Sequence, residues 1–138
     1  GGLFFVLASD FRVAGPKVQL GLAEVRVGVD FPVGPLEIAR DTLSPNVLRR
    51  LMLTGQPMNA QDALAAGVID EISEDVLSDA LRVARQMADI PPSAFGSIKR
   101  QIRQATIDRI TAGMPDGEKM DEPWITDEAR AAMKKMLS

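Results

Sequence analysis

Two glycines stand directly before an apolar run, and they are the first residues in the chain that could do chemistry. Gly1 and Gly2 precede residues 3–8 (LFFVLA), which predict a short buried helix. Backbone N–H groups at the beginning of a helix have no partner within it, so they can stabilise a developing oxyanion. Taken alone, the pair is explained more simply by a tight turn with close packing.

Two carboxylates are the candidates for proton transfer. Glu24 lies in the run LGLAEVRVG (20–28), where apolar neighbours on both sides predict partial burial and suit it as a base. Glu37 follows the segment FPVGP (31–35) at the beginning of a predicted helix, a place where helix electrostatics alone favours a carboxylate. The chain has nineteen Asp and Glu residues, so a solvated loop position is the simpler explanation of Glu24.

Basic residues form three clusters along the chain. They are Arg49 with Arg50, the run KRQIR (99–103), and Lys134 with Lys135. Such clusters usually form solvated helix faces, and binding of a phosphate-bearing ligand is the functional alternative. The charge pattern leaves both explanations open.

The composition of the 138 residues removes several classes of protein. Cys, His and Tyr are absent, which excludes a disulfide framework, a Cys/His zinc site and a Ser-His-Asp triad within this chain. Proton transfer must therefore come from Asp, Glu or Lys, from backbone groups, or from residues outside the chain. A net charge of −3 argues against nucleic acid as a partner. No apolar run approaches the roughly 20 residues of a membrane span and no signal peptide is visible, so we expect a cytoplasmic protein.

Short strands come first and helices follow. The pattern predicts strands over residues 11–14, 18–20 and 68–72, and an irregular loop over residues 29–35. Helices are predicted over residues 2–9, 36–43, 45–53, 60–66, 74–88, 94–110 and 126–136. The N-caps expected for four of them are Ser44, Asn59, Ser73 and Ser93, with Gly55 and Gly67 as stops. This is an α/β pattern with too few strands for a complete sheet, and it looks like the latter half of a domain.

Four motifs, in order and suitably spaced, resemble those of the crotonase superfamily of enoyl-CoA hydratases and isomerases. They are the glycine pair with ASDFRVA (8–14), LGLAEVRVG (20–28), LMLTG (51–55) and AQDALAAGVIDEI (60–72). The resemblance covers most of residues 1–110 and implies a ββα spiral, of which residues 1–90 form the latter part. It implies that residues 91–138 form a C-terminal helical region that supports a homotrimer or a dimer of trimers. Apolar positions in 93–110 and Ile125, Ala129, Ala132, Met133 and Met136 are the expected interface.

The resemblance also implies the chemistry. Family members act on acyl-CoA and enoyl-CoA thioesters in fatty acid metabolism and need no cofactor, since coenzyme A is part of the substrate. Gly1 maps onto one oxyanion-hole donor, with Gly2 in its place if the alignment slips by one. Glu24 maps onto the second of two hydratase glutamates, and Phe4 stands at the place of the first. A single glutamate is similar to the Δ3,Δ2-enoyl-CoA isomerases, which move a double bond from C3 to C2.

The segment 30–35 departs from the glycine-rich loop common in hydratases. The residues predicted to contact substrate are Gly2, Phe4, Phe31 and Glu37. One alternative is a hydratase in which another carboxylate, for example Glu37, replaces the missing one. A second alternative is a non-catalytic acyl-CoA-binding homologue, and a third is a helical interaction fragment in which the glycines and Glu24 are structural.

Overall fold

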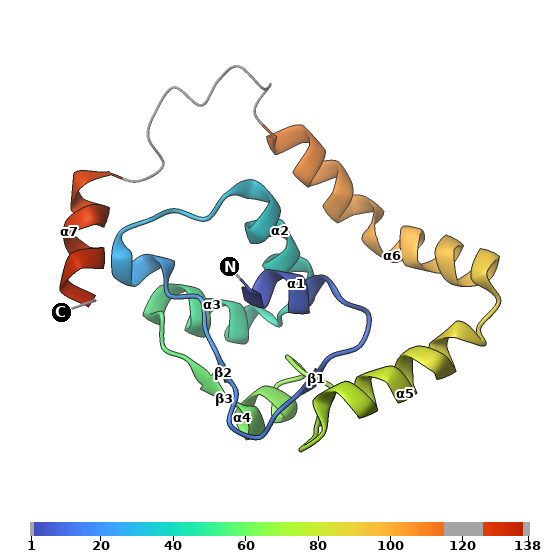
Figure 1. The fold of residues 1–138 in the computed structure, drawn as a ribbon. Coiled ribbons are helices and arrows are strands. Elements are labelled where there is room, and N and C mark those ends of the chain that lie inside the picture. Colours follow the sequence, from blue (N-terminus) through green and yellow to red (C-terminus); the bar gives the residue numbers. More distant parts are fainter. Residues whose placement is uncertain (1, 115–125, 137–138) are drawn as a thin grey trace.

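The structure, a computed structural model, describes residues 2–114 and 126–136 and is mostly helical (Figure 1). Its helices are α1 (Gly2–Ala8), α2 (Val33–Thr42), α3 (Pro45–Thr54), α4 (Ala60–Ala65), α5 (Val76–Ala88), α6 (Pro92–Gly113) and α7 (Asp127–Met136), with a 3₁₀ turn, η1 (Glu24–Val27). The strands are β1 (Val13–Ala14), β2 (Gln19–Leu20), β3 (Met58–Asn59) and β4 (Glu71–Ile72). β1 pairs with β4 in parallel, and β2 pairs with β3 in antiparallel. None of the helices in these two described ranges is long and apolar enough to cross a membrane.

The core collects apolar side chains from segments far apart in the sequence. The fully buried side chains include Leu7 of α1, Leu51 of α3 and Leu22, which lies between β2 and η1, together with Met58 and Ile69. Burying a side chain of this size contributes about 1.5–3 kcal/mol, so these residues set how α1, α3 and the strands lie against one another.

Arg12 fixes the end of α1. Its guanidinium donates to the carbonyl oxygens of Val6 at 3.1 Å and Leu7 at 3.2 Å, which have no partner within so short a helix. Its backbone N–H donates to the Asp70 carboxylate at 2.8 Å, just before β4. Arg12 therefore links α1 to the strand pair formed by β1 and β4.

Several helix boundaries confirm the predictions from local sequence. Ser44 caps α3 by accepting from the Val47 N–H, and Gly55 ends that helix with a φ of 60°. Asn59 caps α4 by accepting from the Asp62 N–H. These caps need only a short polar side chain or a glycine, which is why sequence alone finds them.

Other boundaries differ from the predictions. Asp75, not Ser73, caps α5, because the Ser73 hydroxyl instead donates to Asp79 at 2.6 Å and accepts from the Asp75 N–H. The Ser93 cap is also wrong, since α6 already begins at Pro92. The predicted loop over 29–35 is cut short because α2 begins at Val33 and takes a proline into its first turn, where no N–H is needed.

The last two helices attach to different parts of the chain. α6 lies along α2, and α7 lies against η1 (Figure 1). Ala129 of α7 is fully buried, and its backbone lies 3.9 Å from the place of a Cβ on Gly28. This part of the expected subunit interface is thus covered by the same chain. Ile125 and the side chain of Met136 lie outside the described residues, and assembly stays a prediction.

Candidate functional site

Glu24 begins η1, directly after the segment that buries Leu22 in the core. One carboxylate oxygen, Oε2, is buried and accepts no hydrogen bond from any residue in the described parts of the chain. Leaving a buried polar atom without a partner costs free energy, and such atoms are rare outside sites where a ligand or water supplies the partner. The prediction of partial burial for Glu24 is confirmed.

The backbone carbonyl of Glu24 is fixed by two hydrogen bonds. Its carbonyl oxygen accepts from the N–H groups of Gly28 and Val29, the latter at 3.1 Å. Gly28 has a φ of 67°, the left-handed region that favours glycine, so the chain turns sharply at the end of η1. The 3₁₀ turn therefore presents the carboxylate from a closed loop of backbone hydrogen bonds.

Phe4 and Phe31 are brought together. Their ring centroids lie 6.2 Å apart with an interplanar angle of 78°, an edge-to-face contact, and both pack against the core. Phe4 belongs to α1, and Phe31 follows Glu24 by one short segment. This contact joins the helix behind the glycine pair to the chain that carries the carboxylate.

The glycine pair is seen only in part. Gly1 lies outside the described residues, so its predicted role as an oxyanion donor stays a prediction. Gly2 is exposed at the beginning of α1, and a Cβ placed on it would meet nothing within 4 Å. Its predicted contact with a substrate stays a prediction.

Glu37 has a different environment from Glu24. It is buried, and its two carboxylate oxygens accept from Arg109 at 2.6 Å and Arg40 at 2.7 Å. The hydrogen bond from Arg109, then that from Arg40, lowers the pKa of Glu37 below its ordinary value. Glu37 thus joins α2 to α6 as a carboxylate. Its partner Arg109 lies 72 residues further along the chain, and no local pattern indicates this pairing.

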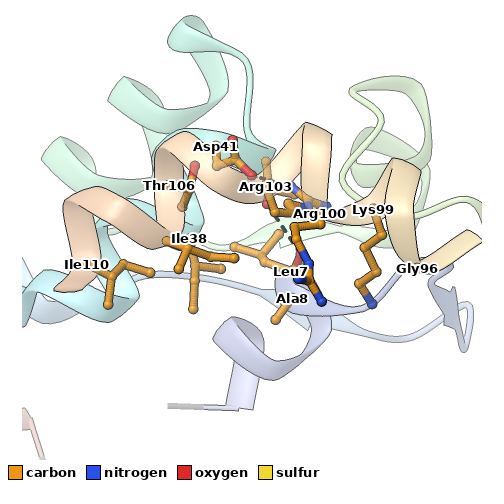
Figure 2. Close-up of a pocket in the computed structure, with 12 residues that line it drawn as sticks. Leu7, Ala8, Ile38, Asp41, Gly96, Lys99, Arg100, Arg103, Thr106 and Ile110 are labelled. Atoms are coloured by element: carbon orange, nitrogen blue, oxygen red, sulfur yellow. Dashed lines mark hydrogen bonds and ion pairs between the residues drawn. The ribbon is translucent and has the colours of Figure 1, made fainter.

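A cavity of about 370 Å³ lies between the end of α1, α2 and α6 (Figure 2). Apolar side chains line it, and basic side chains of α6 stand on one side; the lining includes Leu7, Ile38, Ile107, Ile110, Lys99, Arg100 and Arg103. Lys99 pairs with Asp10 at 2.5 Å and Arg103 pairs with Asp41. Arg100 has no ion pair with a described residue. Neither Glu24 nor Phe4 lines this cavity, so it is separate from the carboxylate.

Among residues 2–114 and 126–136, no group of three or more acidic side chains is placed to hold a metal ion. The described residues offer a buried carboxylate on Glu24, the aromatic pair of Phe4 and Phe31, and the N-terminus of α1. This set is suited to moving a proton on a bound organic substrate.

Comparison with known families decides the identity. The family model for enoyl-CoA hydratase/isomerase matches residues 1–135. The chain belongs to the enoyl-CoA hydratase/isomerase family. The predicted membership of the crotonase superfamily is confirmed.

Relatives within the enoyl-CoA hydratase/isomerase family carry more than one activity in their names. "Probable enoyl-CoA hydratase EchA17" of Mycobacterium tuberculosis is 35% identical over 119 residues, covering 80% of this chain and 45% of that protein. A solved M. tuberculosis enoyl-CoA isomerase is 32% identical with a TM-score of 0.77, covering 81% of this chain and 50% of that one. The same protein is elsewhere named a probable enoyl-CoA hydratase.

The human mitochondrial delta3-delta2-enoyl-CoA isomerase has a TM-score of 0.75 at 28% identity, covering 81% of this chain and 45% of that one. The chain thus spans about half the length of the relatives it matches. These similarities confirm the predicted fold, a partial crotonase-like α/β fold.

Proposed function

We propose that the protein is an enoyl-CoA isomerase that converts a 3-enoyl-CoA to the 2-enoyl-CoA. The observation that carries this proposal is the buried Oε2 of Glu24, which accepts no hydrogen bond from any residue that the structure describes. A second carboxylate is missing where hydratases of this family hold one, since Phe4 stands there and packs on Phe31. One carboxylate beside an apolar wall suits transfer of a proton better than activation of water.

The chemistry needs one base that works twice. Glu24 removes a proton from C2; the pair of that C–H bond forms a double bond between C2 and C1 while the carbonyl pair moves onto the thioester oxygen, which gives a dienolate conjugated with the C3–C4 double bond. The Gly1 N–H is the proposed donor to that oxygen. Glu24 then returns the same proton at C4, which leaves the double bond between C2 and C3. No cofactor is required beyond the coenzyme A of the substrate.

Enoyl-CoA hydration is the second candidate, because EchA17 bears that name. Hydration requires a carboxylate that activates water and another that delivers a proton. The replacement considered above, Glu37, has both oxygens occupied by arginines. This arrangement favours the isomerase over a hydratase built on Glu24 and Glu37.

The cavity beside α6 suits a further part of an acyl-CoA. Its apolar lining can contact hydrocarbon, and Arg100 offers a planar guanidinium, which matches phosphate geometry. This cavity is part of the proposed substrate site. It contributes to binding only, and Glu24 transfers the proton.

The test compares two substrates on the intact protein. We expect turnover of a 3-enoyl-CoA, followed spectroscopically, and slow hydration of a 2-enoyl-CoA. Glu24→Gln keeps the shape of the side chain and should reduce isomerisation by about 10²–10⁴-fold, the usual contribution of general acid–base catalysis. Acyl-CoA affinity, measured by calorimetry, should change little.

Glu74→Gln is the matched control, since Glu74 is exposed and lies outside the four motifs. Rapid hydration without isomerisation would replace the isomerase with the hydratase. Binding of both substrates with turnover of neither would leave a non-catalytic homologue.

A further inference from the structure

Arg26 lies two residues after Glu24 and reaches across to a different helix. Its Nε donates to the carbonyl oxygen of Thr54 at 2.9 Å. Thr54 is the last residue of α3, so its carbonyl has no partner within that helix and lies at the negative end of the helix dipole. A guanidinium is well suited to this position, and here it comes from the 3₁₀ turn that carries the carboxylate.

Gly55 leaves the space that the Arg26 side chain occupies. A Cβ placed on Gly55 would lie 2.8 Å from Cγ, 2.9 Å from Cδ and 2.9 Å from Nε of Arg26. The stem of Arg26 therefore lies flat on the backbone of Gly55, where any larger residue would displace it. Gly55 also has a φ of 60°, so the same glycine ends α3 and admits the arginine.

The 3₁₀ turn has little stability of its own. It is one turn of four residues, and its internal hydrogen bonds are few, which makes such turns easily displaced. Two elements pack on it, α7 on one part and the end of α3 on another. Of these, the contact with α3 is directional, because it is a hydrogen bond from a side chain two residues from Glu24.

We propose that Arg26 is a positioning residue, which sets the direction of the Glu24 carboxylate by fastening η1 to the end of α3 over Gly55. This inference rests on the proposed function for its catalytic consequence, and on geometry alone for the fastening. A displacement of about 1 Å can cost about 10²-fold in rate, so loosening η1 should lower kcat. Substrate affinity should be largely kept, because Arg26 bonds to backbone of its own chain.

Arg26→Met in the intact protein is the first test, since methionine keeps an unbranched stem over Gly55 and removes the donor. We expect kcat for the 3-enoyl-CoA to fall about 10- to 100-fold with KM changed less than about twofold. Arg26→Lys should recover part of the rate, because an ammonium on a similar stem can still donate to a carbonyl. In a Glu24→Gln background, Arg26→Met should cause no further loss. An equal loss in that background, or an unchanged kcat, overturns the proposal.

Gly55→Ala and Gly67→Ala form a matched pair that separates the loss of the Arg26 contact from the strain of a side chain at positive φ. Both glycines have positive φ, 60° and 69°, but a Cβ on Gly67 meets nothing within 4 Å. Both variants should lose stability, and Gly55→Ala alone should lower kcat beyond that loss. Equal kcat values for the two variants, measured where both are folded, would contradict the claim that Gly55 positions Arg26.

Amide hydrogen exchange tests the attachment of η1 to α3 without requiring catalysis. The N–H groups of Gly28 and Val29 donate to the Glu24 carbonyl, so they report on η1 directly. Their exchange should rise at least several-fold in Arg26→Met and stay unchanged in Arg49→Ala, which removes an exposed arginine from α3. Unchanged exchange in Arg26→Met refutes the fastening even if the isomerase is active. Raised exchange in a protein that turns over neither substrate refutes the function and leaves the fastening intact.

Discussion

The contact between Phe4 and Phe31 yields a stability prediction with a defined magnitude. A centroid distance of 6.2 Å and an interplanar angle of 78° fall within the preferred edge-to-face range. Such pairs contribute about 0.5–1.5 kcal/mol beyond their buried area. Phe4→Leu and Phe31→Leu keep an apolar side chain at each place, so each should cost less than about 1.5 kcal/mol.

The assay is a double-mutant cycle on the intact protein, with urea unfolding followed by circular dichroism. Because the first change already removes the ring contact, the double variant should lose about 0.5–1.5 kcal/mol less than the two single losses combined. Phe5→Leu is the control, since Phe5 is the neighbouring ring on α1 and is 81% exposed. It should change stability by no more than about 0.5 kcal/mol.

Additive losses for Phe4 and Phe31 would refute the reasoning. They would mean that the two rings do not meet in solution, and that α1 is not joined to the segment after Glu24 in this way. A coupling equal to the expected one supports the placement of both rings beside the carboxylate segment.

Three other outcomes follow from burial and charge. Leu51→Ala should destabilise the protein by about 2–5 kcal/mol in urea unfolding because Leu51 is fully buried, while Leu53→Ala, 70% exposed, should stay within about 0.5 kcal/mol. Arg109 and Arg40 lower the pKa of Glu37. The stabilisation by the Glu37 carboxylate is therefore present above its ordinary pKa of 4.5 and is lost as pH falls through the lowered value. Glu37→Gln should flatten the acid side of a profile of unfolding free energy measured between about pH 2 and 7. Raising salt from about 0.1 M to 1 M shortens the Debye length from about 10 Å to 3 Å, so amide exchange in α6, which is held by ion pairs, should increase while exchange in α3 does not.

The sequence predicts local structure well where a single residue supplies the cause. Ser44 and Asn59 cap their helices through their own side chains, and Gly55 and Gly67 end them through positive φ. Glu24 belongs to the same class, because its apolar neighbours alone indicate burial. These features need no knowledge of what lies elsewhere in the chain.

Features that depend on a distant partner are not predictable in this way. Ser73 is a good cap by type, but it bonds to Asp79 instead, and the cap passes to Asp75. Arg26 is an unremarkable member of a motif until the end of α3 is placed beside it. Helix electrostatics explains Glu37 locally, yet its environment comes from an arginine on α6.

Helix α6 exposes the apolar positions that the sequence assigns to an interface. Ile98 and Ile102 are 55% and 64% exposed in this chain, and Thr106 is the only buried residue of α6 among those described, so assembly stays a prediction. Within the chain the helix is held through its cations, because Lys99, Arg103 and Arg109 pair with three acidic residues of the preceding chain. Glu37 is buried and the pair of Arg103 with Asp41 is only partly exposed, so these two contacts differ from exposed ion pairs, which contribute about 0–1 kcal/mol each. The place of α6 against α2 therefore depends on charged partners far apart in the sequence, which the spacing of its isoleucines does not reveal.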